Sequence, residues 1–320
     1  MWFDGWHGTL CESPRYYVAR AGEATDLNWH LRRASTFPNH DLMQYAFDLA
    51  NFGPYADPRV LADLAHRAED SGWDGFFIWD HIQVSWPDAV GDPTVQLAAI
   101  ATATSRIKFG PMITPLPRRH PWKLAREAAT LDHLSGGRLI LGIGLGGDVF
   151  TELSTFGYPT DDVVRAEVLD EGLAIMTGLL SGEQFSFEGK HYTIKPTQFL
   201  PKPIQSRIPI WIAGIWPRPR PFRRAARYDG VVPMSSNIEK DLSTDDVRAI
   251  AKFIAENRKN AARFDIVHAG NTAGISRRED ADLVAPFIEA GATWWNEAPL
   301  PWKTTLDDVR ARIAAGPPKI

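Results

Sequence analysis

Short apolar runs alternate with amphipathic segments along the chain from Leu42 onward. The run Phe76–Trp79 contains no polar residue, which is typical of a strand buried on both faces of a parallel sheet. The pattern predicts eight strands, at Gln44–Ala50, Gly75–Asp80, Ile107–Ile113, Arg138–Ile143, Ile208–Ala213, Asp229–Pro233, Asp265–Ala269 and Ala292–Asn296.

Segments with helical spacing of apolar residues lie between these strands. The first follows Asp57-Pro58, a capping residue with a proline at the first helical position. The spacing predicts helices at Pro58–Ser71, Thr94–Thr104, Pro121–Leu134, Asp161–Leu180, Arg218–Arg227, Asp245–Asn257, Arg278–Ala290 and Leu306–Ala314.

This alternation predicts an α/β fold of the TIM-barrel, or (β/α)8, type. Eight strand–helix units in about 275 residues match that barrel better than a doubly wound sheet. A dinucleotide-binding sheet would need a glycine fingerprint after its first strand, where this chain has Asn51-Phe52-Gly53-Pro54. Ser181–Thr193 reads as a β-hairpin inserted between the fourth and fifth units.

We expect two parts in the chain, residues 1–41 and a barrel domain of residues 42–320. Residues 1–41 match no barrel element, and Met43 lies directly before the first strand. We therefore interpret them as an N-terminal extension or a start-site artefact. The alternative is an ordered arm that packs on the barrel through its scattered aromatic residues, such as Trp2 and Trp29.

Composition excludes several classes of protein. With 44% hydrophobic and 23% charged residues, the chain can bury a large core. The net charge of -4 gives no signal for nucleic acid or a membrane surface. Its single cysteine, Cys11, rules out an internal disulfide framework and favours a reducing compartment. We expect a cytoplasmic protein that acts on a small molecule, without a nucleic-acid or membrane partner, and that forms a homodimer.

Chemistry in a TIM barrel is found at the C-terminal ends of the strands, so residues there are the candidates. Asp80-His81 ends the second predicted strand, and a histidine at that rim can contact a ring ligand, move a proton or bind a metal. The alternative is a loop capped by Asp80 with an exposed His81. After the third strand, Arg118 and Arg119 either hold an anion or are solvated charges.

Two glycine-containing strand ends are candidates for backbone contact with a ligand. Gly142–Gly147 follows the fourth strand, and Ala213-Gly214 follows the fifth and precedes a helix. A tight turn is the competing explanation for the first. A metal site assembled from Asp80, His81 and His268 would use residues on separate strands, and no local spacing supports it.

Three segments together resemble the bacterial luciferase-like monooxygenase family, which includes oxidoreductases that use a flavin or the deazaflavin coenzyme F-420 (F420). They are AEDSGWDGFFIWDHI, TPLPRRHPWKLAREAATLDHLSGGRLILGIGLGG and RIPIWIAGIWPRPRPFRRAARYDGVVP. The resemblance covers roughly residues 43 to 315. It implies a barrel that binds the ring of the cofactor at its C-terminal mouth, with a non-proline cis peptide near Met112-Ile113 behind the ring.

The resemblance also assigns roles to individual residues. It implies that His81 takes part in proton transfer beside Asp80, and that the phosphate lies near Ala213 and Gly214. The residues expected to bind the cofactor are Asn51, Asp80, His81, Met112, Ile113, Thr114, Gly144, Gly146, Asp148, Ala213, Gly214 and Ile215. Sugar-phosphate dehydrogenases of the group have a glutamate where this chain has Gly147, so their chemistry is not expected here unless Asp148 replaces it.

The sequence thus predicts an oxidoreductase that transfers a hydride through reduced F420 or FMN to or from a small organic substrate. We favour F420 because of the Trp79-Asp80-His81 junction and the basic residues near the expected mouth, which suit its acidic tail. The alternatives are an FMN-dependent monooxygenase, a flavin-binding barrel without catalysis, and a metal-dependent hydrolase.

Overall fold

A computed structural model describes residues 43–237, 240–272, 274 and 276–319 of the chain. The predicted extension, residues 1–41, and Leu42 lie outside the described residues.

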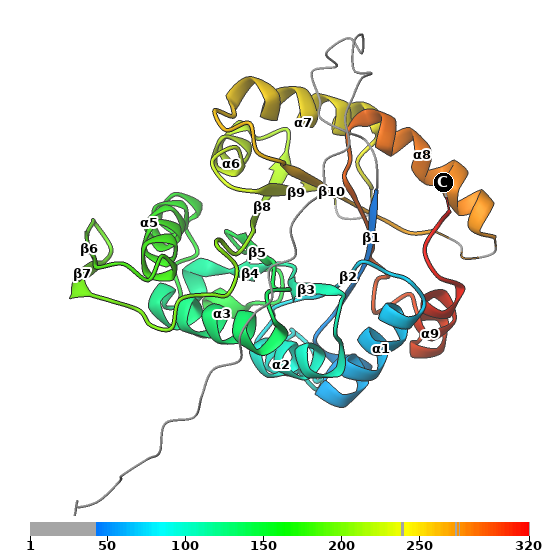
Figure 1. Ribbon diagram of the computed structural model, residues 1–320, viewed down its shortest axis with the longest axis horizontal. Coiled ribbons are helices and arrows are strands. Elements are labelled where there is room, and N and C mark those ends of the chain that lie inside the picture. Colours follow the sequence, from blue (N-terminus) through cyan, green and yellow to red (C-terminus); the bar gives the residue numbers. More distant parts are fainter. Residues whose placement is uncertain (1–42, 238–239, 273, 275, 320) are drawn as a thin grey trace, which may run out of the picture. The chain divides into compact units, whose positions relative to one another are not determined.

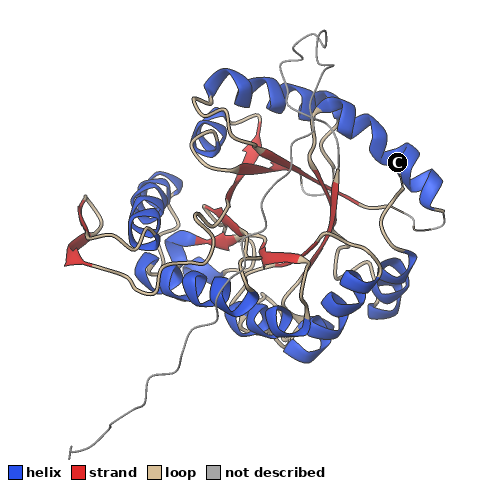
Figure 2. Cartoon of the chain, in the orientation of Figure 1, coloured by secondary structure: helices blue, strands red, loops and turns tan. Residues whose placement is uncertain are grey.

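The described strands form a nearly closed, parallel, barrel-like sheet surrounded by helices (Figures 1 and 2). Its order is β3-β2-β1-β11-β10-β9-β8-β5-β4. An isolated bridge between Phe109 and Leu139 brings β3 toward the segment before β5. The strands are β1 (Gln44–Leu49), β2 (Gly75–Ile78), β3 (Lys108–Pro111), β4 (Thr114–Pro115), β5 (Leu141–Gly144), β8 (Ile210–Trp216), β9 (Gly230–Ser235), β10 (Asp265–Gly270) and β11 (Trp294–Glu297).

All eight predicted strands and all eight predicted helices are present. The helices are α1 (Pro58–Asp70), α2 (Pro93–Ala103), α3 (Pro121–Ser135), α5 (Asp162–Leu180), α6 (Pro219–Ala225), α7 (Thr244–Asn257), α8 (Arg277–Ala290) and α9 (Leu306–Ala315). Asp57 caps α1 as expected, because its side chain accepts a hydrogen bond from the backbone N–H of Arg59. None of the helices within the described ranges is long and apolar enough to cross a membrane.

The structure differs from the prediction at three places. The third strand is divided into β3 and β4, with a cis peptide bond between Met112 and Ile113. The hairpin begins and ends later than expected, as β6 (Phe185–Glu188) and β7 (Thr193–Thr197), because a turn at Ser181-Gly182 separates it from α5. The four-residue helix α4 (Glu152–Thr155) was not predicted, since it is too short to show a helical period.

The inside of the barrel is filled by large side chains from several strands. Phe77, Trp211 and Trp294 lie against one another, with ring centroids 5.2 to 6.0 Å apart. All three side chains are buried, and smaller residues such as Ala46 and Val267 complete the cluster. The interior of the barrel below the C-terminal ends of the strands is therefore a packed core.

Gly110 shows how closely the backbone approaches itself where β3 meets the segment before β5. A Cβ atom at this position would lie 1.7 Å from the carbonyl oxygen of Ile140. We expect Gly110→Ala to lower the free energy of unfolding by about 2 kcal/mol or more, because a backbone oxygen cannot move aside cheaply. Urea unfolding checks this. Gly147→Ala is the control, since its Cβ would meet nothing closer than 3.6 Å, and an equal effect of both substitutions would contradict the prediction.

Candidate functional site

The predicted site residues lie in the loops after β1 and β2, at the junction of β3 and β4, at the end of β5 and in the loop after it, and within β8. Asn51, after β1, is fully buried and links two of these loops. Its amide nitrogen donates to the carbonyl oxygens of His81 and Gly91, both at 2.8 Å. Its amide oxygen accepts from the backbone N–H of His81 at 3.2 Å. Asn51 therefore fixes the backbone of His81 through its side chain.

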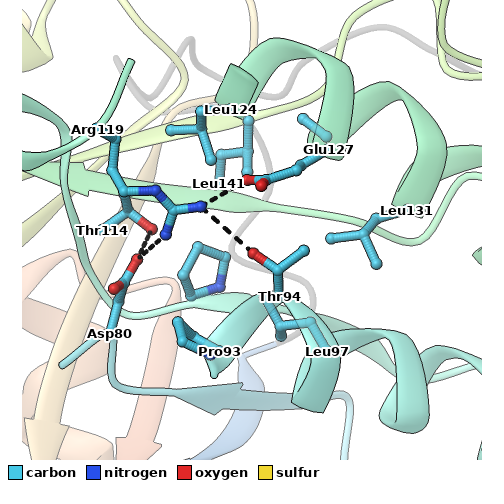
Figure 3. A pocket seen from close by; sticks show the side chains of 12 residues that line it. Asp80, Pro93, Thr94, Leu97, Thr114, Arg119, Leu124, Glu127, Leu131 and Leu141 are labelled. Atoms are coloured by element: carbon cyan, nitrogen blue, oxygen red, sulfur yellow. Dashed lines mark hydrogen bonds and ion pairs between the residues drawn. The ribbon is translucent and has the colours of Figure 1, made fainter. Parts of the chain in front are cut away.

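The Asp80 carboxylate is buried and fully engaged by its neighbours (Figure 3). Thr114 Oγ1 donates to it at 2.7 Å, and Arg119 Nη1 lies 3.3 Å from the same carboxylate oxygen. Arg118 donates to the other oxygen. The adjoining cavity has a volume of about 10 Å³, enough for one water molecule at most. Asp80 thus holds the loops together and does not face a space that would admit a ring.

Arg118 joins two acidic residues in the interior. Its guanidinium lies 2.6 Å from Glu152 Oε1 and also pairs with Asp80, and all three side chains are buried. Arg119 pairs with Asp80 and Glu127. The sequence analysis gave two alternatives for these arginines, ligands of a bound anion or solvated charges. Arg118 fits neither alternative, because it is buried and its partners are carboxylates of the protein.

Glu152, at the first position of α4, is the functional residue that the sequence analysis missed. Its Oε2 lies 2.8 Å from His81 Nδ1, and its Oε1 accepts from the backbone N–H of Ile82 at 2.6 Å. Burial raises the pKa of this carboxyl, but the hydrogen bond from His81, the charge of His81 and Arg118, and the Ile82 N–H together hold it below its ordinary value. Glu152 is therefore an ionised, buried partner of the histidine.

The His81 ring is held at the edge of a set of aromatic side chains. Its Nδ1 is bound by Glu152, and among the residues that the structure describes its Nε2 has no hydrogen-bond partner. The side chain is 24% exposed. A carboxylate on Nδ1 favours a proton there, so Nε2 is the nitrogen left to meet a ligand.

Ring contacts connect His81 to residues of four loops. Its centroid lies 4.7 Å from that of Phe150 and 5.9 Å from that of Trp79. We call the connected set the aromatic rim; it consists of Phe52, Trp79, His81, Trp86, Phe150 and Trp302. Trp86 and Trp302 are 40% and 51% exposed, so the rim presents apolar ring surface to solvent.

Asp148 was considered as a replacement for the glutamate that is missing at Gly147. In the structure it has a different role. Its Oδ1 accepts from the backbone N–H groups of Leu153 and Ser154, at 2.7 and 3.2 Å. Hydrogen bonds from Ser154 are the main reason that its pKa lies below the ordinary value. Asp148 thus stabilises the start of α4, which carries Glu152.

The glycines of the loop after β5 are explained in part by packing between strands. A Cβ on Gly144 would lie 2.2 Å from the Cδ1 atom of Ile113, and one on Gly146 would lie 2.7 Å from Pro115 Cβ. Gly146 also has a φ of 72°, which favours glycine. The predicted cofactor residues Met112, Ile113, Gly144 and Gly146 therefore lie side by side around the cis peptide.

Ala213, Gly214 and Ile215 belong to β8, where the resemblance places a phosphate. A Cβ on Gly214 would lie 2.6 Å from Pro221 Cβ, so the glycine is required by the packing of α6. Substitution of Gly214 would therefore disturb α6 as well as any bound phosphate, and contact of these residues with the cofactor stays a prediction.

His268 lies away from the other histidine of the metal hypothesis. It stacks on Phe287 of α8, with ring centroids 4.0 Å apart, and burial lowers its pKa to about 4. Within the described ranges, no three His, Cys, Asp or Glu side chains are grouped so that they could hold a metal ion.

Comparison with known proteins identifies the family. A model of the luciferase-like monooxygenase family matches residues 38–315. The chain belongs to this family. This confirms the resemblance and the fold that it implied.

One curated relative is similar to part of the chain. The F420-dependent glucose-6-phosphate dehydrogenase of Microbacterium testaceum is 32% identical over 164 residues, which are 50% of this chain and 48% of that protein. The matching region thus spans about half the length of this curated relative.

Two solved structures share the fold. An F420-dependent secondary alcohol dehydrogenase in complex with an F420-acetone adduct has a TM-score of 0.70 at 17% identity, over 85% of this chain and 96% of that one. The oxygenating constituent of 3,6-diketocamphane monooxygenase of Pseudomonas putida, a Type II Baeyer-Villiger monooxygenase in complex with FMN, has a TM-score of 0.57 at 21% identity, over 76% and 71% of the chains.

The ionised Glu152 gives stability a defined pH dependence. Its folded-state pKa is lowered, so its contribution is present above its ordinary pKa of 4.5 and is lost as the pH falls through the lower, folded value. We expect Glu152→Gln to lower the free energy of unfolding by about 3 kcal/mol near pH 7, because Arg118 loses a buried partner. The difference from the parent should shrink at about pH 4 and below. Urea unfolding at both pH values measures it, and an equal loss at both would show that Glu152 is not ionised in the fold.

Proposed function

We propose that this protein is an oxidoreductase that transfers a hydride between a small organic substrate and F420 or FMN bound at the C-terminal mouth of its barrel. The observation that carries the proposal is the 2.8 Å contact between His81 Nδ1 and the buried Glu152. Because Glu152 binds Nδ1, His81 Nε2 stays free at the aromatic rim, where it can give a proton to a bound substrate or take one from it. Family membership supports the reaction class, and the substrate remains open.

The residues at the mouth fit a flat ring cofactor. Exposed apolar side chains stand on the loops after several strands, and in a protein without a ligand such surface indicates a binding site. They are Ile82, Trp86, Val149, Phe156, Met234 and Trp302. Inside the barrel, Asp48 Oδ1 and Asn296 Oδ1 are buried without a hydrogen-bond partner in the described part of the chain. Such oxygens are expected where the protein binds the polar edge of a ligand.

The chain contributes binding, orientation and a proton, while the bound F420 or FMN supplies the hydride chemistry. The aromatic rim excludes water from one side of the mouth. Asn51 fixes the His81 backbone, and Glu152 fixes the ring and its proton on Nδ1. In this arrangement His81 Nε2 can give or take the proton that accompanies hydride transfer to or from a carbonyl or hydroxyl group.

Sugar phosphates are not among the substrates that we propose. Gly147 stands where the resemblance expects a glutamate, and Asp148 is occupied by Leu153 and Ser154. Among the remaining choices we favour F420 and a neutral alcohol or carbonyl compound. FMN-dependent monooxygenation is the second candidate, favoured by the structural similarity to an FMN-bound monooxygenase. We further infer a cytoplasmic homodimer, which light scattering and cell fractionation would test.

Titration of the purified protein with F420 and, separately, with FMN distinguishes these functions. We expect binding of F420 to change its fluorescence with a Kd in the micromolar range, corresponding to about 8 kcal/mol. Tighter binding of FMN, with oxygen consumed once it is reduced, would favour the monooxygenase. If a cofactor binds but no donor reduces it, the protein is a non-catalytic cofactor-binding barrel. If neither F420 nor FMN binds, the proposal is contradicted.

His81→Ala tests the role of the histidine. We expect single-turnover oxidation or reduction of the bound cofactor to slow by about 10²–10⁴-fold, the usual contribution of general acid–base catalysis. Cofactor affinity should change by no more than about threefold, because the loss of one ring contact is small. The control is His191→Ala, since His191 also pairs with a glutamate, Glu167 at 2.9 Å, but lies next to the β6–β7 hairpin. A His81→Ala rate equal to that of the parent would assign the proton to water or to another side chain.

A further inference from the structure

Asp48 is the acidic residue of β1, and beyond noting its unpaired oxygen the function proposed above assigns it no role. It lies on β1 and pairs in register with Phe77 of β2. Residues two apart in a strand share a face, and Ala46 belongs to the cluster inside the barrel. Asp48 therefore points into the barrel, one layer closer to the mouth than Ala46.

The layer that contains Asp48 is more polar than the one below it. Trp79, after β2, and Asn296 of β11, which pairs in register with Ala46, also face the interior, since each follows by two residues an inward-facing aromatic residue, Phe77 and Trp294. Asn296 Oδ1, like Asp48 Oδ1, is buried and has no hydrogen-bond partner in the described residues. Two unpaired oxygens thus lie inside the barrel, toward the C-terminal ends of β1 and β11.

Asp48 also has an environment that suits a neutral acid. It is 7% exposed, and none of the ion pairs in the described part of the chain includes it. Burial raises the pKa of its carboxyl well above the ordinary range, and hydrogen bonding to the Trp79 side chain offsets only part of this effect. A buried oxygen without a partner, such as Asp48 Oδ1, costs stability, so its presence requires a benefit elsewhere.

We propose that Asp48 keeps its proton and donates its O–H to a ring carbonyl of the cofactor bound in the mouth of the barrel. This inference rests on the proposed function. The pyrimidine part of F420 and of FMN carries carbonyl groups, and a carbonyl buried in the barrel would be costly without a donor. A neutral acid also serves a neutral carbonyl better than a carboxylate, which would repel its oxygen.

Two substitutions separate a donor from a merely buried group. Asp48→Asn keeps an N–H donor at nearly the same place, so the Kd for F420 and for FMN should stay within about threefold of the parent. Asp48→Leu has no donor, and its Kd should rise about tenfold, the effect of one lost hydrogen bond. The melting temperature of Asp48→Leu without cofactor should rise by about 2 °C or more, because an unpaired polar group has been removed.

Infrared spectroscopy of the cofactor-free protein tests the proton directly. At neutral pH the parent should show a carbonyl stretch of a protonated carboxylic acid that Asp48→Asn lacks, and this difference does not depend on other buried acids with a raised pKa such as Asp265 and Glu297. The readout depends on no bound molecule, so it separates this proposal from failure of the proposed function.

Each other outcome overturns the proposal. Absence of the band shows an ionised Asp48. A fall in melting temperature for both variants assigns Asp48 a structural role. Equal Kd values for the parent and Asp48→Leu exclude the contact with the ring, and equal weakening by both substitutions shows that a hydrogen-bond donor at this position does not hold the ring. If the parent binds neither cofactor, the ring contact falls with the proposed function, whatever the infrared band shows.

Discussion

The buried guanidinium of Arg118 is the interaction on which the candidate site depends. It binds Asp80 from the loop after β2 and Glu152 from the loop after β5, while Arg118 itself follows β4. A charge in the interior is tolerated only when opposite charges and hydrogen bonds surround it, so these loops can adopt few other arrangements. Because Glu152 in turn binds His81, the buried ion pair also determines the position of the histidine ring.

Short strands and large aromatic side chains impose a second constraint, because they fill the lower barrel completely. Phe77, Trp211 and Trp294 occupy the space that smaller residues would leave open. The space left for a ligand is therefore at the C-terminal ends of the strands and in the loops that follow them. Glycines at positions such as 110 and 144 allow strands and side chains to approach each other where the third strand is divided. The fold thus directs chemistry to one end.

The sequence was sufficient to predict the strands, the helices and the end of the barrel that carries Asp80 and His81. Apolar runs and helical periods are local signals, and parallel strands place their C-terminal ends together. The residues that bind Asp80 and His81 could not be predicted from such local signals. Arginine and glutamate usually lie on the surface, so nothing local marks Arg118 and Glu152 as buried, and α4 is too short to show a period. Asp48 was not singled out from the sequence either, although a carboxylate between Phe47 and Leu49 in a buried strand is a visible signal.

The two carboxyl groups show how the environment, more than residue type, determines what an acid can do. Glu152 is buried but faces Arg118, His81 and a backbone N–H, so the charged form is stabilised and its pKa falls. Asp48 is buried beside Trp79 with no cation, so the neutral form is stabilised and its pKa rises. One barrel mouth therefore combines an ionised acid that orients a histidine with a neutral acid that can donate a hydrogen bond. Opposite shifts in one site are characteristic of enzymes that divide proton transfer and ligand recognition between separate groups. The cost of burying Asp48 without a partner is then offset when a ligand is bound, which is why stability and binding are expected to respond to this residue in opposite directions.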